Sequence, residues 1–144
     1  MASWAEVEAE APELARRARA FLDARTHKTI ATLRADGSPR ISGIEAKIDG
    51  DELTFGSMPS SRKGADLNRD PRFALHSGSD DPPAWQGDAK LSGFAREAAE
   101  SGSGAQHFRA DVKELSVVRL NEERNGLIVE LWKEGEGVRR IDRS

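Results

Sequence analysis

The chain has 144 residues, three histidines and neither cysteine nor tyrosine, so few of its own side chains suit redox or metal chemistry. Its 22 Lys and Arg against 25 Asp and Glu leave a formal net charge of -3, which excludes the basic surplus typical of duplex-binding proteins. No apolar stretch is long enough to span a bilayer, and the acidic N-terminus lacks the features of a signal peptide. We therefore expect a cytoplasmic protein that binds neither nucleic acid nor membrane.

The first predicted element is an amphipathic helix over residues 12–25, within an N-terminal helical segment over residues 1–25. Leu14, Ala18 and Leu22 recur on one helical face, and Phe21 extends it. No linker or internal repeat divides the chain, so we expect a single domain over residues 1–144.

Beyond this helix the sequence changes to short β-like runs separated by turn residues. The predicted strands are Lys28–Arg34, Pro39–Ile48, Glu52–Met58, Arg72–Ser77, Asp88–Ala98, Val112–Leu120, Leu127–Lys133 and Val138–Asp142. Asp-Gly pairs at residues 36–37 and 49–50 have hairpin spacing, which predicts an antiparallel meander for the first three strands. Many strands and few helices favour an antiparallel barrel or closed sheet with helices at its ends.

The second predicted strand contains an apparent slip in its apolar pattern. Ile41 lies on one parity, whereas Ile44, Ala46 and Ile48 lie on the other. Because Gly43 lies at the slip, we expect a β-bulge or a close backbone approach there.

A short helix is predicted over residues 62–68. Ser60 or Ser61 is a suitable N-cap, and the Asp-Pro pair at residues 70–71 ends the helix. Its first turn carries Arg62 and Lys63, two cations at the positive end of the helix dipole, where an anion is favoured. Backbone N–H groups, a serine hydroxyl and these cations would form a phosphate-binding site. The alternative is that both cations are simply exposed and solvated.

The stretch from Phe55 to Pro71 resembles the pyridoxamine phosphate oxidase-like superfamily of FMN-binding split barrels. That family has a strand, then Ser-Arg-Lys, a short helix with a leucine, and Asn/Asp-Pro; Ser61-Arg62-Lys63, Leu67 and Asp70-Pro71 match without a gap. The resemblance implies an antiparallel split β-barrel and a homodimer with the cofactor at its interface. It also implies an FMN-dependent oxidoreductase that acts on a small-molecule substrate.

By this resemblance, Arg62 and Lys63 hold the flavin phosphate, and the second strand runs along the cofactor. Asp88 aligns with a glutamine that contacts the flavin in the oxidases. Trp132 and Arg143 resemble residues that reach FMN from the partner subunit, although an ordinary dimer interface would equally account for Trp132. The implied cofactor-binding set is Arg40, Ile41, Ser42, Gly43, Gly56, Ser57, Ser61, Arg62, Lys63, Asp88, Trp132 and Arg143.

The sequence departs from the true oxidases at three substrate-binding positions. Glu45 stands where they have a lysine that binds the substrate phosphate, Ile141 stands where they have a histidine, and the chain has no tyrosine. Since an acidic residue repels a phosphorylated vitamin, we do not expect a true pyridoxamine phosphate oxidase.

Three other functions stay open at this point. The first is a reductase that uses a deazaflavin (coenzyme F-420), the second is a non-catalytic flavin-binding module, and the third is an interaction domain without a ligand. Some relatives bind heme, but His27, His76 and His107 lie outside the matched cofactor segments. No catalytic residue and no metal site is predicted.

Overall fold

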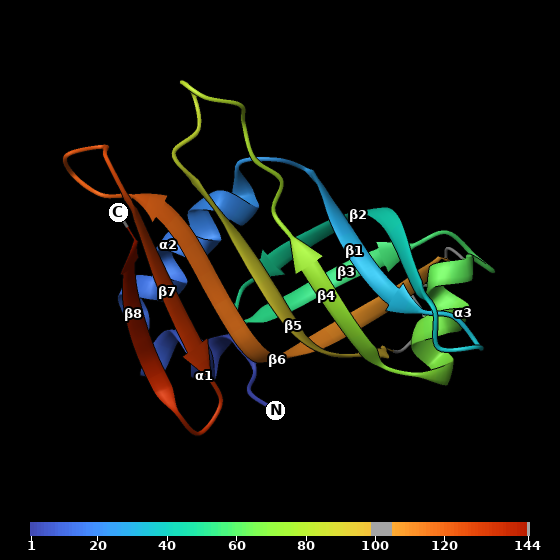
Figure 1. The fold of residues 1–144 in the computed structure, drawn as a ribbon. Coiled ribbons are helices and arrows are strands. Elements are labelled where there is room, and N and C mark those ends of the chain that lie inside the picture. Colours follow the sequence, from blue (N-terminus) through green and yellow to red (C-terminus); the bar gives the residue numbers. More distant parts are fainter. Residues whose placement is uncertain (99–104, 144) are drawn as a thin grey trace.

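The computed structural model describes residues 1–98 and 105–143, and this part of the chain forms three helices and eight strands (Figure 1). The helices are α1 (Trp4–Glu10), α2 (Pro12–Asp23) and α3 (Arg62–Arg69). The strands are β1 (His27–Leu33), β2 (Pro39–Asp49), β3 (Glu52–Ser57), β4 (Arg72–His76), β5 (Gly87–Glu97), β6 (Gln106–Leu120), β7 (Leu127–Lys133) and β8 (Gly137–Arg143).

Six of the strands close into an antiparallel barrel. The sheet order is β3-β2-β1-β4-β5-β6-β7-β8, and an additional pairing between β3 and β6 closes the ring. The first three strands form the predicted meander. β7 and β8 extend the sheet beyond β6 and lie on the side of the molecule away from α3 (Figure 1). The predicted fold class, an antiparallel split β-barrel with flanking helices, is confirmed.

The N-terminal helices pack on the barrel. Leu14, Ala18 and Leu22 of α2 are buried as predicted, whereas Phe21 is only partly buried against the core. α1 is a separate helix that was not predicted from the sequence. Its signal is a capping box, in which Ser3 accepts a hydrogen bond from the backbone of Glu6 and the Glu6 carboxylate accepts one from the backbone of Ser3.

Alternate residues of the strands fill the barrel. Phe55 of β3 contacts Phe73 of β4 edge to face, with ring centroids 5.5 Å apart, and stacks on Phe108 of β6 at 5.8 Å. All three rings are buried, so they join strands that lie far apart in the sequence.

Of the two alternatives predicted at Gly43, the β-bulge is wrong, because β2 keeps an unbroken register with β1 through this residue, and a close backbone approach by a ligand stays a prediction. Arg40 and Ser42 continue the barrel-facing parity of Ile44, and Ile41 points outward. The pattern appeared to slip because a buried ion pair, rather than an apolar residue, occupies the Arg40 position. The register shift of the sheet lies instead in β5, between Ser92 and Gly93.

Candidate functional site

A cleft of about 830 Å³ lies where β2 changes its neighbour from β1 to β3. β1 pairs with β2 as far as Glu45, and β3 pairs with it from Ala46 onward. The cleft is lined by the segment that follows α2, by β2 and β3, and by the start of α3. Its volume is within the range of ligand-binding pockets, roughly 300–1,000 Å³.

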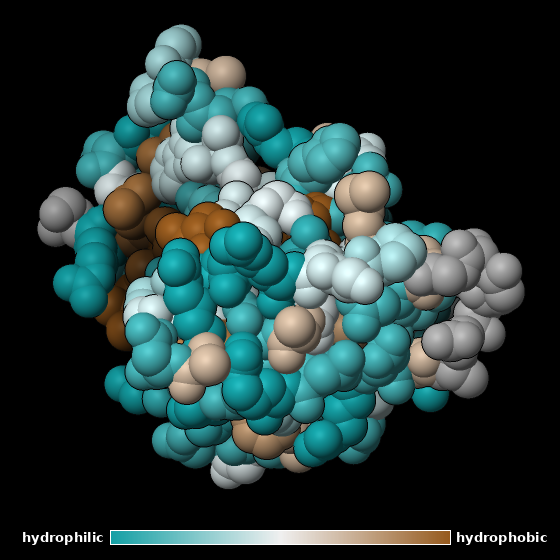
Figure 2. All heavy atoms as spheres, turned by 90° about the vertical axis from the view of Figure 1, so that its right-hand side faces the viewer, coloured by the Kyte–Doolittle hydropathy of each residue, from teal (hydrophilic) through white to brown (hydrophobic). Residues whose placement is uncertain are grey.

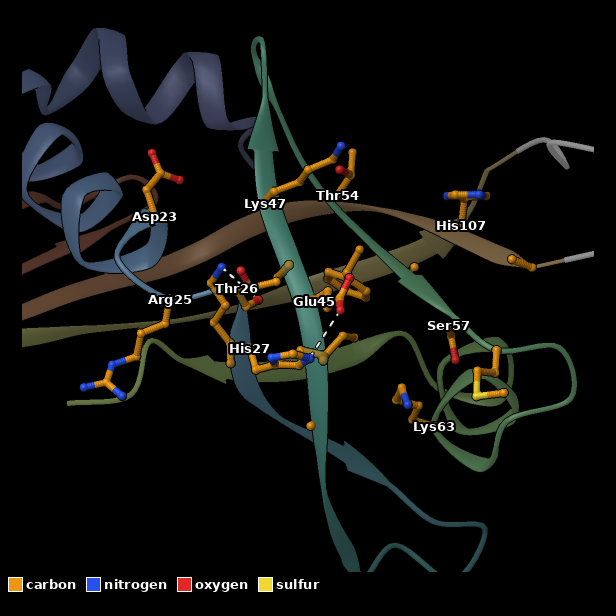
Figure 3. A pocket seen from close by; sticks show the side chains of 18 of the residues that line it. Asp23, Arg25, Thr26, His27, Glu45, Lys47, Thr54, Ser57, Lys63 and His107 are labelled. Atoms are coloured by element: carbon orange, nitrogen blue, oxygen red, sulfur yellow. Dashed lines mark hydrogen bonds and ion pairs between the residues drawn. The ribbon is translucent and has the colours of Figure 1, made fainter. Parts of the chain in front are cut away.

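One end of the cleft lies at the start of α3, and Figure 3 shows Ser57 and Lys63 together there. Ser61 is the N-cap, and its hydroxyl accepts a hydrogen bond of 3.0 Å from the backbone of Gly64. The hydroxyls of Ser57 and Ser61 are hydrogen-bonded to each other. Lys63 has no hydrogen bond or ion pair with any described residue. This end therefore offers an uncompensated ammonium group beside a helix N-terminus, where an anion is favoured.

The walls of the cleft between its two ends carry a glycine from each neighbouring strand. Gly43 of β2 and Gly56 of β3 both line the cleft. At Gly43 a Cβ atom would have no neighbour within 4 Å, and at Gly56 it would meet only a backbone oxygen at 3.8 Å. The missing side chain at Gly43 thus leaves open space at the β2 backbone, against which a flat ring can lie.

Asp66 of α3 ties the helix to β1 and β2 behind the cleft. It is 2% exposed and accepts hydrogen bonds of 2.8 Å from both Arg40 Nε and Thr32 Oγ1, and one of 2.9 Å from Arg69 Nη2. Burial acts to raise the pKa of Asp66, but these hydrogen bonds and the charge of Arg40 outweigh it and lower the pKa to about 2. Arg40 is therefore a partner of Asp66, a role that its predicted assignment to the cofactor did not include.

Arg62 and Lys63 do not enter the same hollow. Successive helical residues point about 100° apart, so Lys63 faces the cleft while Arg62 faces a shallow hollow of about 460 Å³ that also contains Arg34 and Arg40. Within one chain the structure brings Gly43, Gly56, Ser57 and Lys63 to the cleft.

The remaining predicted site residues lie elsewhere. Ile41 is on the outer face of the sheet, Asp88 faces His76 with 3.7 Å between Oδ1 and Nε2, and Arg143 is exposed at the end of β8. Trp132 is 0% exposed and belongs to the core of its own chain. Core residues cover Trp132 within a single chain, and its predicted contact with a cofactor or a partner subunit stays a prediction.

Several residues that the sequence analysis did not assign line the cleft. They are Asp23, Arg25, Thr26, His27, Lys28, Glu45, Lys47, Thr54 and His107, among others. The burial of Lys28 could have been predicted from the sequence, because Lys28 alternates along β1 with Ile30 and Thr32, which also face the barrel. The two histidines had no such signal, because only the folded barrel brings β1 and β6 to the same cleft.

Residues 14–133 match the pyridoxamine 5'-phosphate oxidase family, and the chain belongs to this family. No curated protein sequence matches the chain. Among the described residues, no helix combines the length and apolar character that crossing a membrane requires.

Solved structures with this fold include three bacterial proteins. PhzG from Burkholderia lata 383, in complex with tetrahydrophenazine-1-carboxylic acid, has a TM-score of 0.68 and 14% identity over 92% of this chain and 91% of its own. A heme binding protein from Mycobacterium smegmatis has a TM-score of 0.61 and 13% identity over 91% and 88%. HutZ, the heme storage protein from Vibrio cholerae, has a TM-score of 0.57 and 15% identity over 72% and 90%. At these identities the similarity shows the fold.

Proposed function

We propose that this chain is an FMN-dependent oxidoreductase whose cleft binds the cofactor with the phosphate at the start of α3. The observation that carries the proposal is Lys63, a cation without a partner among the described residues, which lines the cleft at a helix N-terminus. A phosphate supplies the charge that this helix start lacks, since its first turn contains no acidic residue.

The remainder of the cleft also suits a flavin. The open backbone at Gly43 leaves room for a flat ring beside β2, and Gly56 lines the cleft on β3. Ser57 is buried and its hydroxyl is hydrogen-bonded to that of Ser61, so it helps to fix the end of β3 against the start of α3. FMN, when bound, supplies the hydride and one-electron chemistry that these side chains lack. The chain's own residues then bind the phosphate and orient the ring.

The substrate in this proposal is not pyridoxamine phosphate. Glu45 points into the cleft in Figure 3, with its Oε1 atom 3.2 Å from His27 Nε2. A carboxylate at this position repels a doubly charged phosphate ester, so a substrate beside it carries less negative charge or none.

A homodimer is the second part of the proposal. Ile41 is 75% exposed and contributes to an outer groove of about 480 Å³ on the sheet. The groove is lined by Thr29, Ala31, Ile41, Ala74, Leu75, His76, Lys90, Leu91, Ser92, Glu114, Ser116, Val129 and Leu131. Ile41 and Gly43 share the outward parity of β2, so the outer groove leads to the cleft along one strand. A second copy on this groove would lie beside the cofactor.

Absorbance spectroscopy and titration test the cofactor assignment. We expect the purified protein to bind FMN and to show flavin bands, and Lys63→Ala to weaken FMN binding at least tenfold by removing a charge-assisted contact of about 1.5–3 kcal/mol. The double variant Arg62→Ala/Lys63→Ala should weaken FMN binding at least as much as Lys63→Ala, without destabilising the apoprotein. Lys47→Ala, which removes an exposed cation from the same cleft, is the matched control and should keep its affinity. Equal FMN affinity in the Lys63 variant and the wild type would contradict the phosphate site.

The same titration distinguishes the alternatives. Selective binding of the deazaflavin would replace FMN in the proposal, and FMN binding without turnover of any reductant would indicate a flavin-binding module. If neither compound binds at micromolar concentration, both enzymatic proposals are wrong.

Heme binding is the second candidate function. His27 and His107 line the cleft, although the sequence analysis placed them outside the cofactor segments, and two proteins with this fold are described as heme proteins. Neutral imidazole is a common axial ligand of heme iron. A hemin titration tests this candidate: a Soret band that persists in the wild type and is lost in His27→Ala or His107→Ala would favour heme over FMN.

A further inference from the structure

Lys28 is a buried lysine at the wall of the cleft. Its side chain is 6% exposed, and Nζ donates a hydrogen bond of 3.2 Å to the backbone carbonyl of Thr26. No described carboxylate lies within 4.0 Å of it. Burial lowers the pKa of Lys28, and the nearby charges of Asp23 and Glu45 offset this only in part. An ammonium group with one neutral acceptor at a cavity wall can still donate two hydrogen bonds to a ligand.

Ion pairs within the chain satisfy most of the other charged groups in the cleft. Arg25 pairs with Asp80, Lys47 with Asp49 at 3.9 Å, and Asp23 with Arg19 at 3.6 Å. The Oε1 atom of Glu45 lies 3.2 Å from His27 Nε2. Of the lysines and arginines that line the cleft in the described chain, Lys28 and Lys63 are therefore those without a carboxylate partner.

The two lysines come from different elements. Figure 3 shows Lys63 with Ser57 on one side of β2, and Arg25, Thr26 and His27, which immediately precede Lys28, on the other. Glu45 lies between the two groups on β2. If Lys63 receives the cofactor phosphate, as the proposed function requires, Lys28 is left to receive an anionic group of a second molecule.

We propose that Lys28 binds a carboxylate group of the substrate at the end of the cleft opposite the phosphate site. A single ammonium group matches one negative charge. A phosphate would bring about two, and it would face Asp23 and Glu45, whose charges already act on Lys28. The substrate class is therefore a small molecule with one carboxylate. This inference rests on the proposed function for the cofactor end of the cleft, whereas the geometry at Lys28 is independent of it.

Binding of benzoate, compared with its neutral analogue benzamide, tests the inference by calorimetric titration of the whole protein, with and without FMN. We expect the wild type to prefer benzoate at least tenfold. Lys28→Gln should remove this preference, and Lys28→Arg should restore a large part of it. FMN affinity should change less than twofold in both variants, because Lys28 lies away from the α3 start. Lys47→Gln is the matched control, since it removes an exposed lysine of the same cleft and should keep the preference.

Two outcomes would overturn the assignment. One is that the wild type fails to prefer benzoate; the other is that Lys28→Gln prefers benzoate as strongly as the wild type, which would leave Lys28 only to stabilise the Thr26 carbonyl. Thermal unfolding identifies a variant that does not fold, in which case Lys28→Met gives the same comparison. If the wild type does not bind FMN, the cofactor proposal is wrong. The preference of the apoprotein for benzoate then still tests the role of Lys28.

Discussion

Asp66 fixes the start of α3, at one end of the cleft, by accepting hydrogen bonds from three side chains. These are Arg40 of β2, Thr32 of β1 and Arg69 of α3. Its carboxylate stays charged although it is almost fully buried, because all three neighbours donate hydrogen bonds to it. Without the Asp66 carboxylate, the guanidinium of Arg40 would lose the negative charge that neutralises it. Asp66 therefore positions α3, and with it Lys63, without lining the cleft.

We predict that Asp66→Asn lowers the free energy of unfolding at pH 7 by about 3 kcal/mol, the range for breaking a buried ion pair. The pKa of Asp66 in the fold, about 2, lies below its unfolded value. Its contribution is thus fully present above about pH 4 and is lost as the pH falls toward 2. Urea denaturation followed by tryptophan fluorescence should show the difference from wild type shrinking over this window. A difference that does not vary with pH would argue against the charged pair. Asp142→Asn, at an exposed ion pair, should change stability little.

At the scale of elements, two strand glycines have different roles. Gly93 lies at the register shift of β5, where a Cβ atom would come within 1.8 Å of the Asp111 carbonyl oxygen on β6. At Gly43 of β2, a Cβ atom would have no neighbour within 4 Å. The first glycine allows two strands of the barrel to approach, and the second leaves a wall of the cleft free.

We predict that Gly93→Ala costs about 1–3 kcal/mol or more, because the backbone of β6 must move. Gly43→Ala should leave stability unchanged or slightly raised, since alanine loses less conformational entropy in a strand. Gly43→Ala should nevertheless weaken FMN binding several-fold, because the methyl group enters the cleft. Denaturation midpoints and FMN titrations of the two variants measure both effects. Equal stability of the two variants would contradict the close approach at Gly93, and unchanged FMN affinity would contradict ring binding beside Gly43.

At the scale of the whole molecule, hydrophobic residues are unevenly distributed on the surface. Figure 2 shows hydrophobic side chains gathered toward one side of the face at the α3 end, and the rest of that face is largely hydrophilic. Ile41 is among the few large apolar residues that the described chain exposes. A contiguous apolar patch on a surface can mark an interaction site, whereas single exposed apolar residues are normal.

We predict that Ile41→Lys converts a dimer into a monomer, because a charged lysine would replace an exposed apolar side chain in the outer groove. Sedimentation velocity at micromolar concentration measures the change. Arg16→Glu, on the exposed side of α2, is the control and should remain dimeric. A monomeric wild type, or a dimer that withstands Ile41→Lys, would rule out this interface.

The elements and their boundaries depend largely on local sequence. The meander is predicted by the Asp-Gly turns and by the alternation of apolar and polar residues within its strands. The helix that begins at Arg62 and Lys63 is predicted by its serine cap and by the proline that ends it. Both kinds of signal involve neighbouring residues. β6 was predicted to begin only at Val112, whereas it begins at Gln106. Polar residues alternate with Phe108 and Ala110 in its first half, and that half closes the barrel against β3.

Only the tertiary structure decided which side chains meet in the cleft. His107 is brought to the cleft by the closing of the barrel, which pairs residues about 50 positions apart, and His27 and Lys28 are brought there by the pairing of β1 with β2. Trp132 is indistinguishable by sequence from an interface residue, yet packing makes it part of the core. The sequence by itself determined the family pattern, a positively charged helix start after a strand, because capping and the helix dipole act within a few residues. The barrel decided what faces that helix start, because burial and ion pairing depend on neighbours distant in the chain.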